Sequence, residues 1–450
     1  MPPALLALLL HSAVAVPADD AVLVDIREAS AADVAALKQA DGVRWWVELG
    51  DRLMLAGDPP PRFPVSAGVP VLGHFADVRP GELVLRGVGC DVGESVPGTL
   101  VARGGRWQLR RLGAGEAMPA AHGHDESWRV VEPNEVVARQ YRLDAPLAAP
   151  PDPQILPVVQ QVDAARWFAG LSQLASWDRS SYGTTSLFAA RDWIGEQFAD
   201  LGLEVEKPDF AMPGPGGGTI TRQNVIGRWT GTTHPDEWIV VGAHYDSRNA
   251  SLGSTVSAPG AEDNASGCAG VIEMARALVP FHPQRTILFM CYAGEEQNLY
   301  GSTRHVQALQ ASGDIAKVMQ VVTMDMIGYS ADERLDADYE SYASQQGYLD
   351  RFGAAAATYV PELHVTYSLN PFGSDHMPYL RAGKETVLAI ESDWDIYPYY
   401  HKSSDTPANI GPNVLGMGGA ILRTNVAVVA DLAGARADLD DRVFEDGFDG

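Results

Sequence analysis

Two apolar segments in the middle of the chain each run directly into side chains that can bind a metal ion. Residues 238–243, WIVVGA, lead into the sequence HYD, and residues 285–293, RTILFMCYA, lead into GEE. Continuous apolar runs of this length are typical of strands that are buried on both faces of a parallel sheet. Ligand sites in open α/β sheets lie beyond the carboxyl ends of the strands. Four polar side chains are therefore expected at one edge of the sheet: His244, Asp246, Glu295 and Glu296.

The loop between these two segments carries a further candidate ligand. Asp263 lies in the stretch APGAEDNASG, which opens a helix, and Gly260 allows the backbone to turn there. Asp and Asn are also strong helix-capping residues. The local sequence therefore leaves helix capping and metal binding both open.

Two more candidates follow later segments. Asp325 comes directly after residues 321–324, VVTM, and His401 lies in the loop sequence YPYYHKSSDT. Taken singly, each has an ordinary structural explanation, as a surface acid or a structural histidine. Taken together, the candidates form a balanced set for two divalent cations, with one bridging carboxylate and a spare glutamate. Mixed nitrogen and oxygen ligands favour zinc, with cobalt or manganese as alternatives.

Strands and helices alternate along the second part of the chain, which predicts a mostly parallel sheet with helices on both faces. The fold class is therefore an α/β three-layer αβα sandwich with a mixed central sheet. The expected strands are residues 203–207, 223–228, 238–243, 285–293, 316–324 and 386–392. The expected helices are residues 162–176, 185–201, 264–281, 300–311, 344–359 and 413–435.

Residues 18–145 are predicted to form a separate, small β-rich unit. Two hairpins are expected in it, one turning at Gly50-Asp51 and one at Gly104-Gly105, because both pairs suit turns with positive φ. The proline-rich stretch 146–157, PLAAPPDPQILP, is expected to be an extended linker without a helix. The C-terminal region, residues 158–435, carries the metal-ligand candidates, and residues 436–450 form an acidic tail.

Residues 1–17 are interpreted as a secretory signal peptide, although no Lys or Arg precedes the apolar run ALLALLL. The expected location is therefore extracellular or periplasmic. The chain has 33 basic and 58 acidic residues, for a net charge of −25. This charge disfavours nucleic acid or an anionic membrane as a partner.

Three cysteines, Cys90, Cys268 and Cys291, give no disulfide framework. The second lies at a helix start and the third in an apolar strand. Both are expected to be buried free thiols.

The motifs as a set resemble those of the co-catalytic dinuclear zinc aminopeptidases, in particular the secreted bacterial leucyl aminopeptidases. The matching stretches are DEWIVVGAHYDS, SAPGAEDNASG, FMCYAGEEQNLYGS, MDMIGY, SDH at 374–376 and HKSSDT. They occur in the same order, over roughly residues 158–435. The N-terminal region lies outside the resemblance.

The resemblance implies two zinc ions per chain and a role for each matching residue. His244 and Asp325 would bind one ion, Glu296 and His401 the other, and Asp263 would bridge them. Asp246 would orient His244, and Glu295 would be the general base. The peptide bond between Asp263 and Asn264 would be cis.

One stretch departs from the family pattern. The relatives have a disulfide-bounded loop, CGYAC, whose tyrosine contacts the tetrahedral oxygen, whereas this chain has SLNPFGSDH. Tyr367 or another group is expected to take the place of that tyrosine. Met326 and Phe372 are expected to form an apolar wall of the substrate pocket.

The resemblance implies hydrolysis of N-terminal, apolar residues from peptides, by a protein that is expected to be a monomer. Three alternatives stay open: a carboxypeptidase, a glutaminyl cyclase with one metal ion, and a non-catalytic receptor-like module. For residues 18–145 a pro-region that assists folding or covers the active site is one hypothesis. An accessory domain that stays attached is the other.

Overall fold

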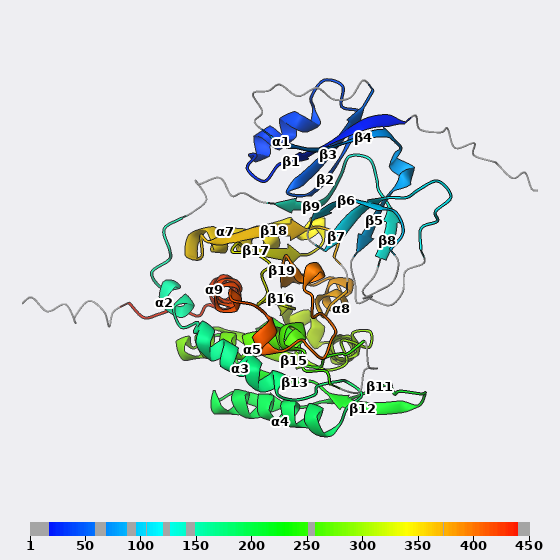
Figure 1. Cartoon of the computed structure of the whole chain (residues 1–450). Helices are drawn as coiled ribbons and strands as arrows, with labels where there is room; N and C mark the ends of the chain where they lie inside the picture. The colour runs from blue at the N-terminus through cyan, green and yellow to red at the C-terminus, as the bar shows by residue number, and fades with distance from the viewer. Residues whose placement is uncertain are drawn as a thin grey trace, which may run out of the picture.

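The computed structural model of the chain describes residues 18–58, 69–87, 96–104, 106–119, 127–140, 149–250, 257–371 and 373–439. A sheet of thirteen strands runs through these residues, in the order β10-β13-β15-β14-β16-β19-β17-β18-β9-β2-β3-β1-β4. Helices cover both faces of the part of the sheet that belongs to the C-terminal region (Figure 1). The expected α/β sandwich with a preceding β-rich region is therefore confirmed.

Four parallel strands form the centre of the sheet: β14 (His234–His244), β15 (Arg285–Tyr292), β16 (Val318–Met324) and β19 (Glu385–Glu391). Their carboxyl ends meet at one edge, as the two apolar segments predict. The strands that flank them are β13 (Val225–Trp229), β10 (Glu204–Glu206), β17 (Leu335–Glu340) and β18 (Leu363–Ser368). A separate hairpin consists of β11 (Asp209–Pro213) and β12 (Thr219–Gln223).

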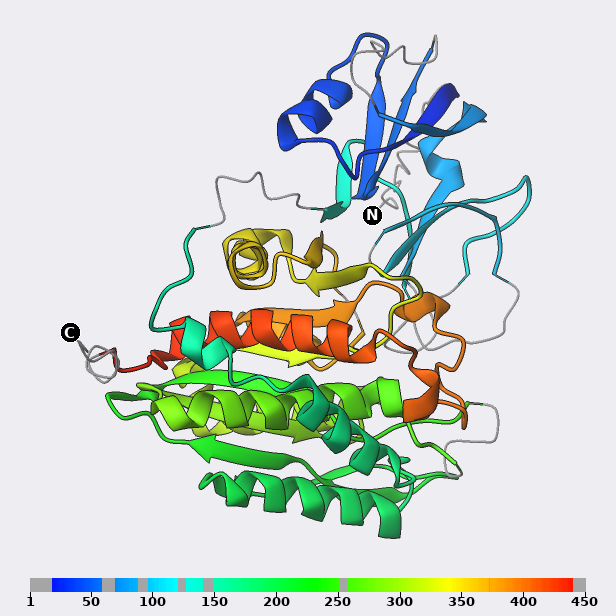
Figure 2. The same cartoon turned by 60° about the vertical axis from the view of Figure 1, so that its left-hand side comes forward.

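One face of the sheet packs against the larger group of helices, and these enclose the main core. They are α3 (Ala164–Ala175), α4 (Thr185–Asp200), α5 (Ser266–Leu278), α7 (Gln346–Tyr359) and α9 (Val414–Ala433) (Figure 2). The opposite face packs against α6 (Tyr300–Ser312) and α8 (His376–Arg381). Helix α9 is long and apolar enough to cross a membrane, but 78% of that stretch is buried here, which is what a core helix shows.

Strands β17 and β18 are absent from the sequence-based expectation. Strand β17 has the sequence LDADYE, in which Asp338 and Glu340 are fully buried. Because of these acidic residues the segment was not recognised as a strand. A charged segment of this kind lacks the apolar pattern from which strands are recognised.

The N-terminal region is β-rich, as expected. Five of its strands extend the large sheet: β1 (Asp19–Asp25), β2 (Trp45–Gly50), β3 (Arg52–Gly57), β4 (Val71–Val78) and β9 (Glu135–Gln140). Four others form a second sheet: β5 (Leu83–Gly87), β6 (Thr99–Gly104), β7 (Trp107–Arg111) and β8 (Ser127–Val130). Both expected hairpins form, as β2–β3 and β6–β7. Helix α1 (Ala31–Lys38) begins at Ser30, whose side chain accepts a hydrogen bond from the backbone of Asp33.

This N-terminal region is joined to the C-terminal region edge to edge. Strand β9 pairs antiparallel with β18, with Tyr367 opposite Arg139, and parallel with β2 on its other side. The backbone hydrogen bonds of the large sheet therefore continue from one region into the other.

The expected linker is described only from Ala149 onward, and its last two residues begin a short helix, α2 (Leu156–Val159). The expectation that its prolines exclude a helix is therefore wrong. Pro157 lies in the first turn of α2, where proline removes no hydrogen bond that the helix needs.

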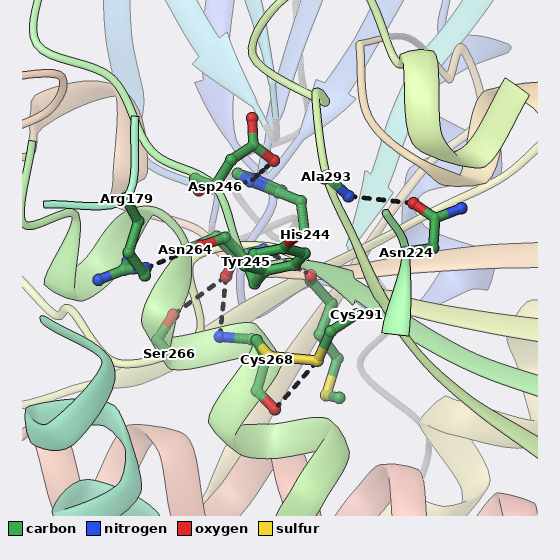
Figure 3. Close-up of a disulfide and its surroundings, with 12 residues drawn as sticks. Arg179, Asn224, His244, Tyr245, Asp246, Asn264, Ser266, Cys268, Cys291 and Ala293 are labelled. Atoms are coloured by element: carbon green, nitrogen blue, oxygen red, sulfur yellow. Dashed lines mark hydrogen bonds and ion pairs between the residues drawn. A yellow bond between two sulfur atoms is a disulfide. The ribbon is translucent and has the colours of Figure 1, made fainter. Parts of the chain in front are cut away.

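The expectation of free thiols is also wrong for two cysteines. Cys268 in α5 and Cys291 in β15 form a disulfide, with their Cα atoms 5.8 Å apart (Figure 3). The two residues are 23 positions apart in the sequence, and they meet only because α5 packs on the central strands. Cys90 lies outside the described residues.

Candidate metal centre

The carboxyl ends of the central strands bring all five expected ligands together. His244 ends β14, Glu296 follows β15, and Asp325 follows β16. Asp263 comes from the loop before α5, and His401 from the loop between β19 and α9. All five side chains are buried, with at most 9% of each residue exposed.

Asp263 lies between the two histidines. Its Oδ1 is 3.4 Å from Nε2 of His244, and its Oδ2 is 2.8 Å from Nε2 of His401. Nε2 of His244 is also 3.4 Å from Oδ1 of Asp325, and Nε2 of His401 is 3.2 Å from Oε2 of Glu296. One carboxylate thus faces two separate groups of ligands, as a bridging ligand does.

Two clusters of candidate ligand atoms result, each with all its atoms within 4.8 Å of one another. One contains His244, Glu295 and Asp325, and the other contains Asp263, Glu296 and His401. Both oxygens of Glu296 and Oδ1 of Asp325 are buried and accept no hydrogen bond from the described part of the chain. Because buried polar atoms are normally satisfied, these oxygens fit a bound cation.

The charges in the site are strongly coupled. Burial, together with the charge of Glu296, raises the pKa of Asp263 to about 6. Burial alone would lower the pKa of His244, but the carboxylates of Glu295 and Asp325 outweigh it and raise that pKa well above its ordinary value. So many acids in a buried site need positive charge, and divalent cations supply it while displacing protons.

Asp246 connects the two strand ends. Its carboxylate accepts hydrogen bonds from Oγ of Ser181 and from the backbone N–H groups of Glu295 and Glu296, the latter two at 3.3 and 3.4 Å. Nδ1 of His244 lies 3.1 Å from the backbone oxygen of Asp246 and 3.7 Å from its carboxylate. The residue therefore holds both the imidazole ring and the Glu295-Glu296 turn.

The loop that carries Asp263 is fixed by residues whose role the sequence does not reveal. Gly260 adopts a positive φ of 49°. Three residues later the peptide bond between Asp263 and Asn264 is cis, as the resemblance implies. Asp405 accepts hydrogen bonds from the backbone N–H groups of Glu262 and Asp263, at 2.9 and 3.1 Å. Asp405 therefore supports the backbone of a proposed metal ligand directly.

Two further supporting residues were not predicted. The buried guanidinium of Arg179 donates to the backbone oxygens of Tyr245 and Gly260. Oγ of Ser374 donates to Oδ2 of Asp325 at 2.7 Å. Ser374 belongs to the SDH motif, but Arg179 has no signal in the sequence.

Four of the five ligands, Asp263, Glu296, Asp325 and His401, line a small cavity with a free volume of about 20 Å³, close to the space of one water molecule. Its walls include Arg106, Met326, Ile390, Trp394 and Tyr400. Met326 therefore lies where an apolar wall is expected, whereas Phe372 is outside the described residues. Tyr367 does not line the cavity, and its hydroxyl accepts a hydrogen bond from the backbone of Gly353 instead.

A sequence model of peptidase family M28 matches residues 224–426. A probable zinc metalloprotease of Pyrenophora teres f. teres is 33% identical over 208 residues, which are 42% of this chain and 42% of that protein. The first curated relatives are matched over only about two to three fifths of their length.

Solved structures with the same fold include an aminopeptidase from Aneurinibacillus sp. strain AM-1. It has a TM-score of 0.53 at 16% identity, over 63% of this chain and 96% of that one. A glutaminyl cyclase from Bacteroides thetaiotaomicron has a TM-score of 0.50 at 18% identity, over 60% of this chain and 98% of that one. Together the matches confirm the resemblance to the co-catalytic zinc aminopeptidases.

Proposed function

We propose that this chain is a zinc aminopeptidase that holds two zinc ions. His244 and Asp325 would hold one ion, Glu296 and His401 the other, and Asp263 would bridge them. The observation that carries the proposal is the placement of Asp263, whose two oxygens face different histidines. When bound, such a pair of ions lowers the pKa of a shared water and polarises the scissile carbonyl.

Glu295 is proposed as the general base. Its Oε2 is 3.9 Å from Nε2 of His244, and the residue lines the cavity without being needed to complete the bridged set. A glutamate in this position can take a proton from the attacking water and pass it to the leaving amine.

The test compares Glu295→Gln with wild type on leucine p-nitroanilide. The variant keeps the shape of the side chain but cannot accept the proton, so kcat is expected to fall by about 10²–10⁴-fold. Zinc content is expected to stay at two ions per chain. Full activity in this variant would remove Glu295 from the mechanism.

Activity assays and zinc analysis also distinguish the three alternatives: a carboxypeptidase, a glutaminyl cyclase and a receptor-like module. A panel of aminoacyl p-nitroanilides and N-blocked peptides, with and without chelator, distinguishes an aminopeptidase from a carboxypeptidase. One zinc ion per chain would favour the cyclase, and zinc binding without any hydrolysis would favour the receptor-like module. Apolar N-terminal residues are proposed as the preferred substrates.

Secretion and a monomeric state belong to the same proposal. The apolar leader supports secretion, and residues 1–17 lie outside the described part of the chain. Sequencing the N-terminus of the exported protein tests the first, and light scattering on a sizing column tests the second.

A further inference from the structure

The N-terminal region places one cation in the wall of the metal centre. Arg106 lies at the turn of the β6–β7 hairpin, just before β7. Only 4% of the residue is exposed, and it lines the same cavity as Asp263, Glu295 and Asp325. Among the described residues of that wall it is the only Arg or Lys.

The guanidinium of Arg106 is held from several sides. Its Nη2 donates to the backbone oxygen of Gly373 at 3.3 Å, and its Nη1 lies 3.6 Å from Oε1 of Glu340. The group also lies over the ring of Trp394, 5.3 Å from the ring centre. Glu340 is itself fixed by Nε2 of His376 at 2.9 Å. A cation held in this way needs little rearrangement when a negative charge develops beside it.

The loop that Arg106 contacts is the loop that departs from the family pattern. Residues of the N-terminal region hold this loop at Asn370. Nε1 of Trp107 donates to the Asn370 backbone oxygen at 3.0 Å, and Arg129 donates to its side chain at 3.1 Å. Asn370 in turn donates to the backbone oxygen of Val137 at 3.0 Å. The N-terminal region thus supports the segment that carries a tyrosine in the relatives.

We propose that Arg106 is a catalytic residue, which donates a hydrogen bond to the oxygen of the scissile carbonyl as that carbon becomes tetrahedral. This inference rests on the proposed aminopeptidase function. The attacking water forms a bond to the carbonyl carbon, the π electrons move to the oxygen, and the proton of the water goes to Glu295. The C–N bond then breaks, and the proton passes to the leaving nitrogen. Arg106 keeps all its protons and stabilises the charge on the oxygen.

Two features of the site favour this role over recognition of a distant group. Arg106 shares the wall of a small cavity with Asp263, Glu295 and Asp325, so its cation faces the same space as the proposed ligands and base. The N–H donors of a guanidinium lie in one fixed plane, so Arg106 can direct a hydrogen bond at the carbonyl oxygen of a substrate that is itself held in one position. The N-terminal region is then part of the working enzyme.

The experiment uses the full chain, loaded with zinc, and the variants Arg106→Met and Arg106→Lys. Arg103→Gln is the matched control, since Arg103 lies in the same hairpin and contacts Asp395 outside the cavity. With leucine p-nitroanilide, Arg106→Met is expected to lower kcat by about 10²–10³-fold. KM should change by less than about threefold. Arg106→Lys should recover part of the loss, and Arg103→Gln should retain wild-type kcat.

A second readout separates catalysis from folding. Affinity for the phosphonate analogue of leucine, a tetrahedral anion, should fall by the same factor as kcat/KM. Zinc content and the thermal midpoint of unfolding are measured on each variant. If Arg106→Met does not fold, the comparison with wild type is made with Arg106→Lys.

Several results would overturn the role of Arg106. An increase in activity would show that Arg106 only blocks the cavity. A higher KM for the dipeptide Leu-Gly, with the anilide unaffected, would assign it to a substrate carboxylate. Unchanged kcat in both variants would remove it from the reaction. Wild-type protein with two zinc ions and no activity on any anilide would instead refute the proposed function itself.

Discussion

The disulfide is expected to contribute a measurable share of the stability of the chain. It joins α5, which follows Asp263, to β15, which precedes Glu296 (Figure 3). Closing a loop with a separation of 23 residues removes entropy from the unfolded chain that corresponds to about 3.4 kcal/mol in the chain-entropy model. Unfolding entropy is roughly 2.1 cal/mol/K per residue, so the thermal midpoint should fall by about 4 °C if the whole chain unfolds together.

The assay is equilibrium unfolding in urea with and without a thiol reductant, on zinc-free protein in a Cys90→Ala background. The substitution removes the third thiol, so disulfide exchange cannot obscure the result. Reduction occurs in the unfolded state and leaves both sulfur atoms in the core when the chain refolds. The measured difference therefore reports loop closure and not a cavity. A difference below about 1 kcal/mol would refute the loop-entropy reasoning for this pair.

Three further outcomes follow from individual side chains. Asp263→Ala should lower the zinc content, and it should lower activity by about 10³-fold or more, because both ligand groups lose their shared carboxylate. Elemental analysis that shows two tightly bound ions in this variant would contradict the bridging role. Asp405→Ala should cost about 2–4 kcal/mol of stability, since it removes the acceptor for two buried backbone N–H groups, and urea unfolding measures this. Burial lowers the pKa of His305 from 6.5 to about 4. Between these two pH values the unfolded state binds a proton that the folded state does not. The free energy of unfolding present above pH 6.5 is therefore lost as the pH falls toward 4. Over this pH range the variant His305→Gln should lose about 3 kcal/mol less free energy of unfolding than the wild type. If the pH dependence of unfolding is the same in both proteins, this explanation is wrong.

The central strands and the ligands at their ends could be predicted because the responsible signals are local. An apolar run such as WIVVGA predicts a buried strand without knowledge of its neighbours, and the carboxyl ends of parallel strands share one edge. This argument covers His244, Glu296 and Asp325, whereas Asp263 and His401 lie in loops and were assigned to the site through the resemblance; the structure brings all five together.

Other features depend on which segments pack side by side, and the tertiary structure alone decides these. Cys268 and Cys291 meet because a helix crosses a particular strand, and nothing near either cysteine in the sequence records that crossing. Strand β17 carries buried acids whose charge conceals it. Arg106 reaches the metal centre from a region with no motif, because β9 and β2 extend the sheet and the β6–β7 hairpin packs against β2. Local patterns fix what each segment becomes, whereas contacts between distant segments depend on the complementary shapes of whole surfaces.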